Sequence, residues 1–297
     1  MRDTRIFKQV DVFTNRKFKG NPVAVFFDAD DLNSDEMQAI AKWTNLSETT
    51  FVLKTTNKDA DYKLRIFTPK NELPFAGHPT IGSCFALIES GLIQPKSGKL
   101  IQECGAGLVE ILVGGDVSIP KNLILSFRLP YFHITPIDTS VHLELESALK
   151  ISSGFCSKIA SPVLLDVGPK WLTIQLVEGI DVINLEPNYT EIARLSNFYG
   201  WTGIEVFGKH EDGTYESRSF APVIGVNEDP ACGSGAGALG VYLSLISAKD
   251  TKSADIKQGC KIARDAKLHV SIDKLNDKPS ISVGGQAVTC IIGNYEP

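Results

Sequence analysis

The second half of the chain repeats a motif from the first half. Residues 62–77 read YKLRIFTPKNELPFAG, and residues 215–233 read YESRSFAPVIGVNEDPACG. With three residues added to the second spacer, eight of the fifteen aligned positions are identical. The copies are offset by 153 residues before the spacer and by 156 after it, about half of the 297-residue chain. The repeat predicts a duplicated fold, and a cleft between two like domains is a natural place for a small-molecule site.

A nearly apolar helix is expected directly after each copy of the repeat. Residues 80–90 read TIGSCFALIES, and residues 235–246 read GAGALGVYLSLI. A helix without a polar face must be buried on every side. Strand patterns dominate most of the remaining sequence, so we predict an α+β fold in which a strand-rich wall surrounds one central helix, built twice.

Local signals predict several other elements. Asn33 is a plausible N-cap, with Glu36 three residues later, for a helix over residues 34–44. The alternation of apolar and polar residues predicts a strand over residues 62–67 with Tyr62, Leu64 and Ile66 on one face. Further strands are expected, among others, over residues 260–264, 267–273 and 279–292.

The composition excludes several classes of protein. The chain is 43% apolar and 22% charged, with a net charge of −5. It has no basic stretch for nucleic acid and no apolar run long enough to cross a membrane. Its six cysteines form no CxxC or His-rich cluster, so we expect no metal site and no disulfide framework. The N-terminus lacks a signal-peptide core, and we expect a cytoplasmic protein.

Each copy of the repeat presents a possible anion-binding group. Pro-x-x-Gly stands immediately before each apolar helix, where the first turn has unpaired N–H groups and the positive end of the helix dipole. Gly77 and Gly233 would let an anion approach this backbone. The next residues, His78 and Ser234, can both donate hydrogen bonds when neutral. We therefore expect a small-molecule carboxylate as the substrate.

Four motifs resemble those of the PhzF-type phenazine-biosynthesis family. They occur in family order, and the resemblance extends from about residue 8 to 290. The resemblance implies the diaminopimelate-epimerase-like fold, with two similar domains that are each a β-barrel around a central apolar helix. The four motifs are KGNPVAV (19–25), NLSETTF (45–51), FAGHPTIG (75–82) and NEDPACGSG (227–235).

We expect two domains, linked near residues 128–139. The N-terminal barrel domain would comprise residues 1–128 plus about 282–297, and it would carry Glu48 and His78. The C-terminal barrel domain would comprise about residues 129–281, and it would carry Asp229 and Ser234. By analogy with the family, a homodimer is also expected to be possible.

The resemblance implies roles for individual residues. Glu48, in the NLSET motif, would be the acid/base that moves a proton within the substrate, without a metal or an organic cofactor. The type member isomerises a dihydroxylated cyclohexadiene carboxylic acid. The expected catalytic residues are Glu48, His78, Asp229 and Ser234, and the expected substrate-binding residues are Gly77, Gly233, Gly235 and Cys232.

Differences between the two copies favour one catalytic carboxylate. Counting 153 residues on from Glu48 reaches Trp201, so Glu48 has no acidic counterpart. Epimerases and racemases of the implied fold carry one cysteine in each half, but Cys232 aligns with Ala76. Alanine cannot transfer a proton, so an isomerase is favoured over a two-thiol racemase.

Alternative interpretations stay open for the function and for single residues. An amino-acid racemase or epimerase would need Cys232 paired with another base, and a metabolite-binding protein would bind ligand without turnover. Asp229 could orient its own loop, and Ser234 could cap its helix. Because Arg65 and Arg218 recur in both copies, a structural task is favoured for them, such as pairing with Glu72 and Glu228, over the alternative of contact with the substrate.

Overall fold

The structure is a computed structural model, and the chain divides into two compact units. Unit 1 comprises residues 1–128 and 284–297, and unit 2 comprises residues 129–283. The residues that the structure describes are 4–152, 155, 161–247, 251–275 and 278–296.

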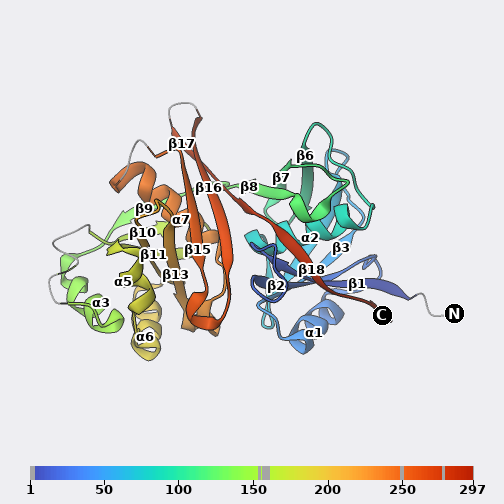
Figure 1. Cartoon of the computed structure of the whole chain (residues 1–297). Coiled ribbons are helices and arrows are strands. Elements are labelled where there is room, and N and C mark those ends of the chain that lie inside the picture. Colours follow the sequence, from blue (N-terminus) through green and yellow to red (C-terminus); the bar gives the residue numbers. More distant parts are fainter. Residues whose placement is uncertain (1–3, 153–154, 156–160, 248–250, 276–277, 297) are drawn as a thin grey trace. The chain divides into compact units, whose positions relative to one another are not determined.

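In unit 1 a mostly antiparallel sheet surrounds the helix α2 (Figure 1). Strands pair in the order β18, β1, β2, β3, β4, β6, β7, β8, and only the pairs β2–β3 and β4–β6 are parallel among these. The short strand β5 adds to β4. The elements are β1 (Arg5–Val12), β2 (Asn21–Phe26), α1 (Ser34–Thr44), β3 (Glu48–Leu53), β4 (Tyr62–Phe67), β5 (Glu72–Leu73), α2 (Gly77–Glu89), β6 (Lys99–Cys104), β7 (Gly107–Gly114), β8 (Ile124–Arg128) and β18 (Ala287–Tyr295).

Unit 2 repeats this succession of strand pairs. The pairs β11–β12 and β13–β15 are parallel, and β12–β13 and β15–β16 are antiparallel. The elements are β9 (His133–Pro136), α3 (His142–Leu149), β10 (Val163–Asp166), β11 (Lys170–Glu178), α5 (Gly179–Asn184), α6 (Tyr189–Tyr199), β12 (Gly203–Lys209), β13 (Tyr215–Ala221), β14 (Val226–Asp229), α7 (Gly233–Tyr242), β15 (Ser253–Gln258), β16 (Ala266–Leu275) and β17 (Lys278–Gly285). The sequence repeat is therefore a repeat of strand topology.

The two apolar helices are buried as predicted. Every residue from His78 to Ile88 of α2 is buried, and α7 is buried except at Ser234. Helix α2 begins three residues before the predicted start, and α7 ends at Tyr242, where a short π-helical turn (Leu243–Ser247) follows. A Cβ atom on Gly82 would lie 2.4 Å from a methyl group of Val23, so this glycine lets strand β2 pack against α2.

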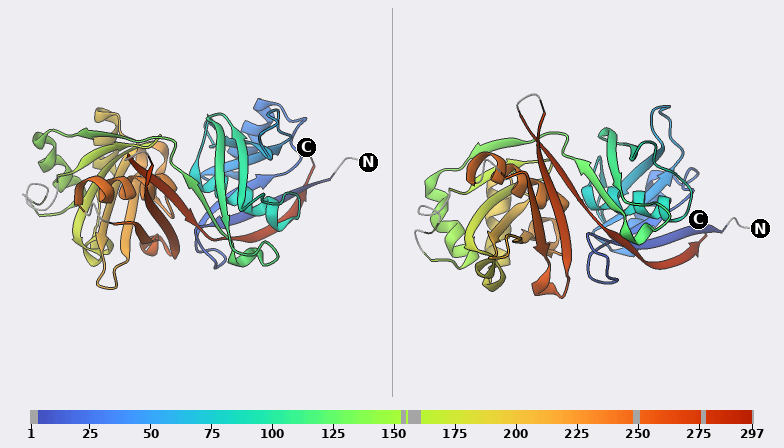
Figure 2. Two further views of the ribbon diagram at one scale, coloured as in Figure 1. Left: turned by 90° about the horizontal axis from the view of Figure 1, so that it is seen from above. Right: turned by 45° about the horizontal axis from the view of Figure 1, so that its top comes forward.

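Other helices cover the opposite face of each sheet. In unit 1, α1 packs on β3 and β4 over a cluster that includes Met37, Phe51 and Phe67. In unit 2, α3, α5 and α6 form an apolar layer with β11 and β12, and α3 and α6 lie against each other (Figure 2). Residues of β12 alternate between this layer and α7, since Ile204 and Val206 join the layer and Glu205 faces α7.

Most local predictions are confirmed, and two need correction. Helix α1 has the predicted bounds and a complete capping box between Asn33 and Glu36. Residues 260–264 are not a strand, because Gly259 and Ala263 have positive φ angles of 88° and 60° and enclose a 3-10 turn. The predicted long strand over 279–292 is two strands, β17 and β18, separated at Gln286.

The helices that the structure describes are all too short or too polar to cross a membrane.

The recurring arginines pair with the recurring glutamates, as predicted. Arg65 donates two hydrogen bonds to Glu72, of 2.7 and 2.6 Å, and Arg218 donates two to Glu228, of 3.0 and 2.8 Å. The side chains of Arg218 and Glu228 are 2% and 3% exposed, whereas those of Arg65 and Glu72 are 22% and 42% exposed. Arg218 also donates to the carbonyl groups of Val182 and Leu185, which fixes the end of α5.

This difference in burial predicts that the same substitution lowers the free energy of unfolding by different amounts at the two arginines. Arg218→Met leaves the Glu228 carboxylate buried without its partner, so the free energy of unfolding should fall by about 3–5 kcal/mol. Arg65→Met removes a partly exposed pair and should cost about 1 kcal/mol or less. Urea denaturation followed by far-ultraviolet circular dichroism measures both values, and equal costs would contradict the prediction.

Candidate active site

Glu48 lies at the start of β3, where a tight turn leads out of α1. Asn45 ends α1 in the left-handed conformation, with φ 53°, and β3 then pairs in parallel with β2, so that Glu48 is opposite Val23. The hydroxyl groups of Thr44 and Thr49 are 2.7 Å apart and tie the helix end to the strand. The position of Glu48 is therefore held from both sides.

His78 lies beside Glu48. It is the second residue of α2, after the N-cap Ala76 and Gly77. His78 Nε2 is 3.3 Å from Glu48 Oε2, and the two side chains are 8% and 16% exposed. The structure thus brings together the two residues of unit 1 that the sequence predicts to be catalytic.

The Glu48 carboxyl is in an environment that favours its neutral form. Burial raises its pKa to about 7, and a hydrogen bond from Ser47 opposes this rise. Glu48 Oε2 is buried and accepts no hydrogen bond from the described residues. Most buried polar atoms are hydrogen-bonded, so an exception of this kind points to a functional group.

The start of α7 in unit 2 is capped by a thiol. Cys232 is the N-cap, and its Sγ accepts a hydrogen bond of 3.2 Å from the Gly235 N–H. Ser234 is the second residue of α7, as His78 is of α2, and its Oγ accepts a hydrogen bond of 2.9 Å from Trp171 Nε1. The capping interpretation proposed for Ser234 therefore applies to Cys232 instead.

Asp229 ends β14 and orients the loop before α7. Its Oδ1 accepts a hydrogen bond of 2.9 Å from the Ala231 N–H. Gln258 spans the same loop, since its Oε1 accepts from the Cys232 N–H at 3.0 Å and its Nε2 donates to the Asp229 carbonyl at 3.1 Å. Asp229, Cys232, Gly233, Ser234 and Gly235 thus lie within one short segment of unit 2.

Two of the glycines expected to bind substrate have packing reasons of their own. A Cβ atom on Gly77 would lie 2.5 Å from the ring of Phe127, and one on Gly235 would lie 2.5 Å from Glu205 Oε2. A side chain at either position would therefore have to displace Phe127 or Glu205. The packing of each unit thus favours glycine at both positions, whether or not a ligand binds to the backbone.

The strand registers correct the predicted counterpart of Glu48. Phe51 pairs with Arg65 in unit 1, and Val206 pairs with Arg218 in unit 2. Glu48 therefore corresponds to Gly203 and not to Trp201. A Cβ atom on Gly203 would lie 2.1 Å from the Phe220 carbonyl oxygen, so no carboxylate fits there. The conclusion that Glu48 has no acidic counterpart is unchanged.

Sequence reasoning missed Trp171 and Gln258. Trp171 reaches Ser234 from 63 positions away, and its own sequence context carries no sign of this contact. A signal did exist for Gln258, because the offset of 156 residues that relates Gly77 to Gly233 also relates Gln102 to Gln258. Gln102 is buried as well, and its Nε2 donates to Thr80 Oγ1 on α2 at 3.0 Å.

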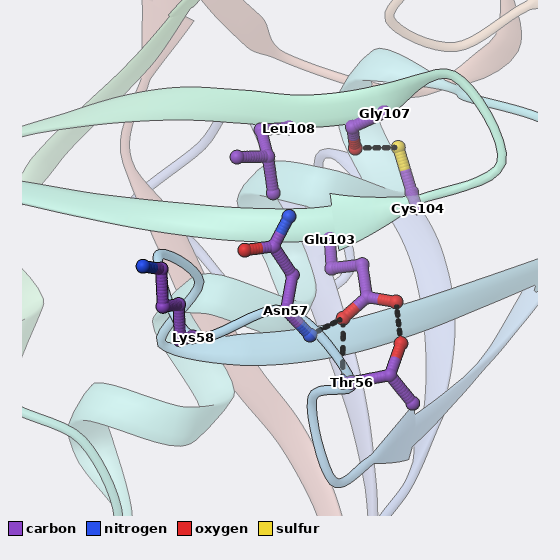
Figure 3. A pocket seen from close by; sticks show the side chains of 7 residues that line it. All are labelled: Thr56, Asn57, Lys58, Glu103, Cys104, Gly107 and Leu108. Carbon is purple, nitrogen blue, oxygen red and sulfur yellow. Dashed lines mark hydrogen bonds between the residues drawn. The ribbon is translucent and has the colours of Figure 1, made fainter.

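A separate depression of about 530 Å³ lies at the other end of β3 (Figure 3). The Glu103 carboxylate accepts hydrogen bonds there from the N–H groups of Thr56 and Asn57, at 2.7 and 3.0 Å. These two backbone donors are thus already bound to Glu103, and this depression contains none of the predicted site residues. Among the described residues, no group of three His, Cys, Asp or Glu side chains could hold a metal ion.

Comparisons with known proteins identify the class. The family model of PhzC-PhzF, phenazine biosynthesis-like protein, matches residues 10–293. The chain is 54% identical to antisense-enhancing sequence 1 of Schizosaccharomyces pombe, over 97% of each protein. It is 32% identical to the trans-2,3-dihydro-3-hydroxyanthranilate isomerase of Pseudomonas aeruginosa, over 93% of this chain and 94% of that protein.

A solved structure supports the same assignment. The phenazine biosynthesis protein of the PhzF family from Bacillus anthracis superposes with a TM-score of 0.85 and 26% identity, over 99% of each chain. The fold and the relatives define an isomerase. The chain belongs to the PhzC–PhzF family of phenazine biosynthesis-like proteins, and the resemblance and fold predicted from the sequence are confirmed.

The raised pKa of Glu48 predicts a pH-dependent loss of stability. Between the ordinary pKa of 4.5 and the folded-state pKa of about 7, the unfolded chain releases the proton of Glu48 while the folded chain keeps it. The free energy of unfolding of the wild type should therefore fall across this range relative to that of Glu48→Gln. Urea denaturation at pH 4.5, 6 and 8 measures the difference.

Glu211→Gln, which changes an exposed glutamate, is the matched control and should follow the wild type across this pH series. A Glu48→Gln variant that also follows the wild type would contradict the raised pKa.

Proposed function

We propose that this protein is a cofactor-independent isomerase that moves a proton within a small unsaturated or cyclic carboxylic acid, with Glu48 as the acid/base. The observation that carries the proposal is the buried Glu48 carboxyl, with a pKa of about 7, 3.3 Å from His78. Membership of an isomerase family supports it.

The chemistry suits a single carboxyl group. A proton shift between two carbons requires one group that removes a proton as a base and returns it elsewhere as an acid. A group whose pKa is near 7 is present in both forms at neutral pH, so neither step requires an unfavourable ionisation first. His78, as the neighbour of Glu48, would donate a hydrogen bond to the charge that develops on the substrate.

The residues of unit 2 are proposed to bind the substrate. The first N–H groups of α7 and the hydroxyl group of Ser234 are suitable donors for a carboxylate. Trp171 donates to Ser234 Oγ, so the Ser234 hydroxyl proton can be donated either to Cys232 Sγ, 3.4 Å away, or to a bound carboxylate. Asp229, which shapes the loop before α7, would keep these donors oriented. That residues of both units bind the same substrate molecule remains a prediction from the sequence.

The substrate class follows from the relatives. The relative from Pseudomonas aeruginosa is named for trans-2,3-dihydro-3-hydroxyanthranilate, a cyclic unsaturated amino acid. We propose that the substrate of this chain shares the carboxylate and the ring or conjugated double bond, because a carbon-bound proton is acidic only beside such a group. This compound is accordingly the first member of the test panel.

Replacement of Glu48 should abolish proton transfer. We expect Glu48→Gln to slow incorporation of solvent deuterium at carbon by about 10²–10⁴-fold, because the amide cannot accept the proton. Proton NMR of a panel of cyclic and unsaturated carboxylic acids in deuterated water measures the rate.

Glu146→Gln, at another buried glutamate, is the control for a general effect of the substitution and should retain exchange if it remains folded. Exchange by Glu48→Gln at the wild-type rate would refute the role of Glu48. Ligand binding without exchange by the wild type would favour the metabolite-binding alternative.

Replacement of Cys232 separates the isomerase from a racemase. Burial raises the pKa of the Cys232 thiol well above its ordinary value, so the thiol is protonated at neutral pH. We expect Cys232→Ser, which can still cap α7, to keep the rate of deuterium exchange within about fivefold of the wild type. Chiral chromatography of amino acids incubated with both proteins tests the alternative, since racemisation that is lost in Cys232→Ser would favour it.

A further inference from the structure

A buried carboxyl group lies beneath the start of α7 and has no part in the function proposed above. Glu205, on β12, is 0% exposed. It stands opposite Ser219 in the β12–β13 pair, and its Oε1 and Oε2 are hydrogen-bonded to the hydroxyl groups of Ser217 and Ser219, respectively. In the neutral acid one of these oxygens carries the proton and donates it to its serine partner, whose hydroxyl then accepts. Its Oε2 also occupies the space that a side chain at position 235 would fill.

Hydrogen bonds continue from Glu205 to the loop before α7. Ser219 Oγ accepts a hydrogen bond of 3.0 Å from Gln258 Nε2. Gln258 in turn accepts a hydrogen bond from the Cys232 N–H and donates one to the Asp229 carbonyl. Ser219 and Gln258 are each at most 2% exposed, so bulk water does not compete for these bonds. The chain of bonds runs from the buried carboxyl to the residues that begin the helix.

We propose that Glu205, as a neutral carboxylic acid, is a positioning residue that holds the start of α7 in its binding geometry through Ser219 and Gln258. The proposal rests on the proposed function for its catalytic consequence, since α7 is assigned there to binding the substrate carboxylate. Its structural part, the ordering of the loop before α7 by Glu205, does not depend on that function.

The charges around Glu205 favour its neutral form. Burial and the negative charge of Asp229 raise the pKa of Glu205 to about 8, against the hydrogen bonds from Ser217 and Ser219. Glu205 also interacts with the Cys232 thiol on the loop before α7 and contributes to the raised pKa of that thiol. On β13 the groups that face Glu205 are hydroxyls. Ionisation above pH 8 would place a second negative charge beside Asp229, at a helix start that is proposed to bind an anion.

Unit 1 has a neutral residue at the position equivalent to Glu205. By strand register, Thr50 corresponds to Glu205, since Phe51 and Val206 pair with the equivalent arginines. Thr50 Oγ1 lies 2.8 Å from Ser83 Oγ on α2, a direct contact between neutral groups. Only unit 2 therefore has an ionisable group at this position.

Amide hydrogen exchange tests the proposal without an activity assay. In Glu205→Ala, peptides that cover residues 229–236 should exchange about tenfold faster than in the wild type, because the anchor of Ser219 and Gln258 is lost. Glu205→Gln keeps a neutral group of the same size and should stay within about threefold. After correction for intrinsic exchange, protection in the wild type should fall as the pH rises through about 8, and protection in Glu205→Gln should not.

The matched control is Glu216→Gln, because Glu216 is also a buried glutamate of unit 2 but accepts hydrogen bonds from Cys260 and contacts His210 instead. It should leave residues 229–236 unchanged. Unchanged protection in folded Glu205→Ala, or the same pH dependence in the wild type and in Glu205→Gln, would overturn the inference.

Kinetics then separate this inference from the proposed function. We expect Glu205→Ala to raise KM for the carboxylate substrate about tenfold while kcat changes less, because the α7 half of the site would bind rather than transfer protons. Loosening of residues 229–236 with no change in KM would support the positioning by Glu205 but contradict the role of α7 in the proposed function. A variant that lowers kcat alone would overturn the assignment of Glu205 to positioning.

Discussion

Each unit depends on the burial of nearly every residue of a helix that has no polar face. Helix α2 and helix α7 can be stable only if strands enclose them on all sides, and the sheet of each unit does so. Burial also takes the first turn of each helix out of bulk water, where its unpaired N–H groups need a partner. The same constraint that makes the fold thus creates two polar sites at the starts of α2 and α7.

The two sites have diverged while their frameworks have not. Both units keep the same succession of strand pairs, an Arg–Glu pair and a buried glutamine. The groups close to the helix starts differ, with Glu48 and His78 in unit 1 and Cys232 and Ser234 in unit 2. Gly203, the counterpart of Glu48, lies against the backbone of β13 and leaves no room for an acid. The asymmetry is therefore fixed by packing and not only by the choice of one residue.

Features with a local signal were predictable from the sequence. The capping box of α1 depends on two residues three positions apart, and the Arg–Glu pairs follow from residues that recur at a constant offset. The turn at residues 260–262 was not predictable, because Ala263 adopts a positive φ angle that its residue type does not indicate. Glu205 and Trp171 were missed for a different reason. Glu205 contacts Ser219 and Trp171 contacts Ser234 only because the fold brings these distant residues together. A single acidic or aromatic residue within a strand does not predict such a contact.

The pairing of β1 with β18 has a consequence for how the chain is made. Arg5 lies opposite Tyr295, and Lys8 bonds to Glu89, which in turn accepts from Thr289. Unit 1 is therefore built from two separate segments of the chain, whereas unit 2 is continuous in sequence and lies between them. During synthesis unit 2 can fold before strand β18 has been made, and β1 gains its β18 partner only after residues 287–295 have been translated. The unit that carries Glu48 is thus begun before unit 2 and completed after it.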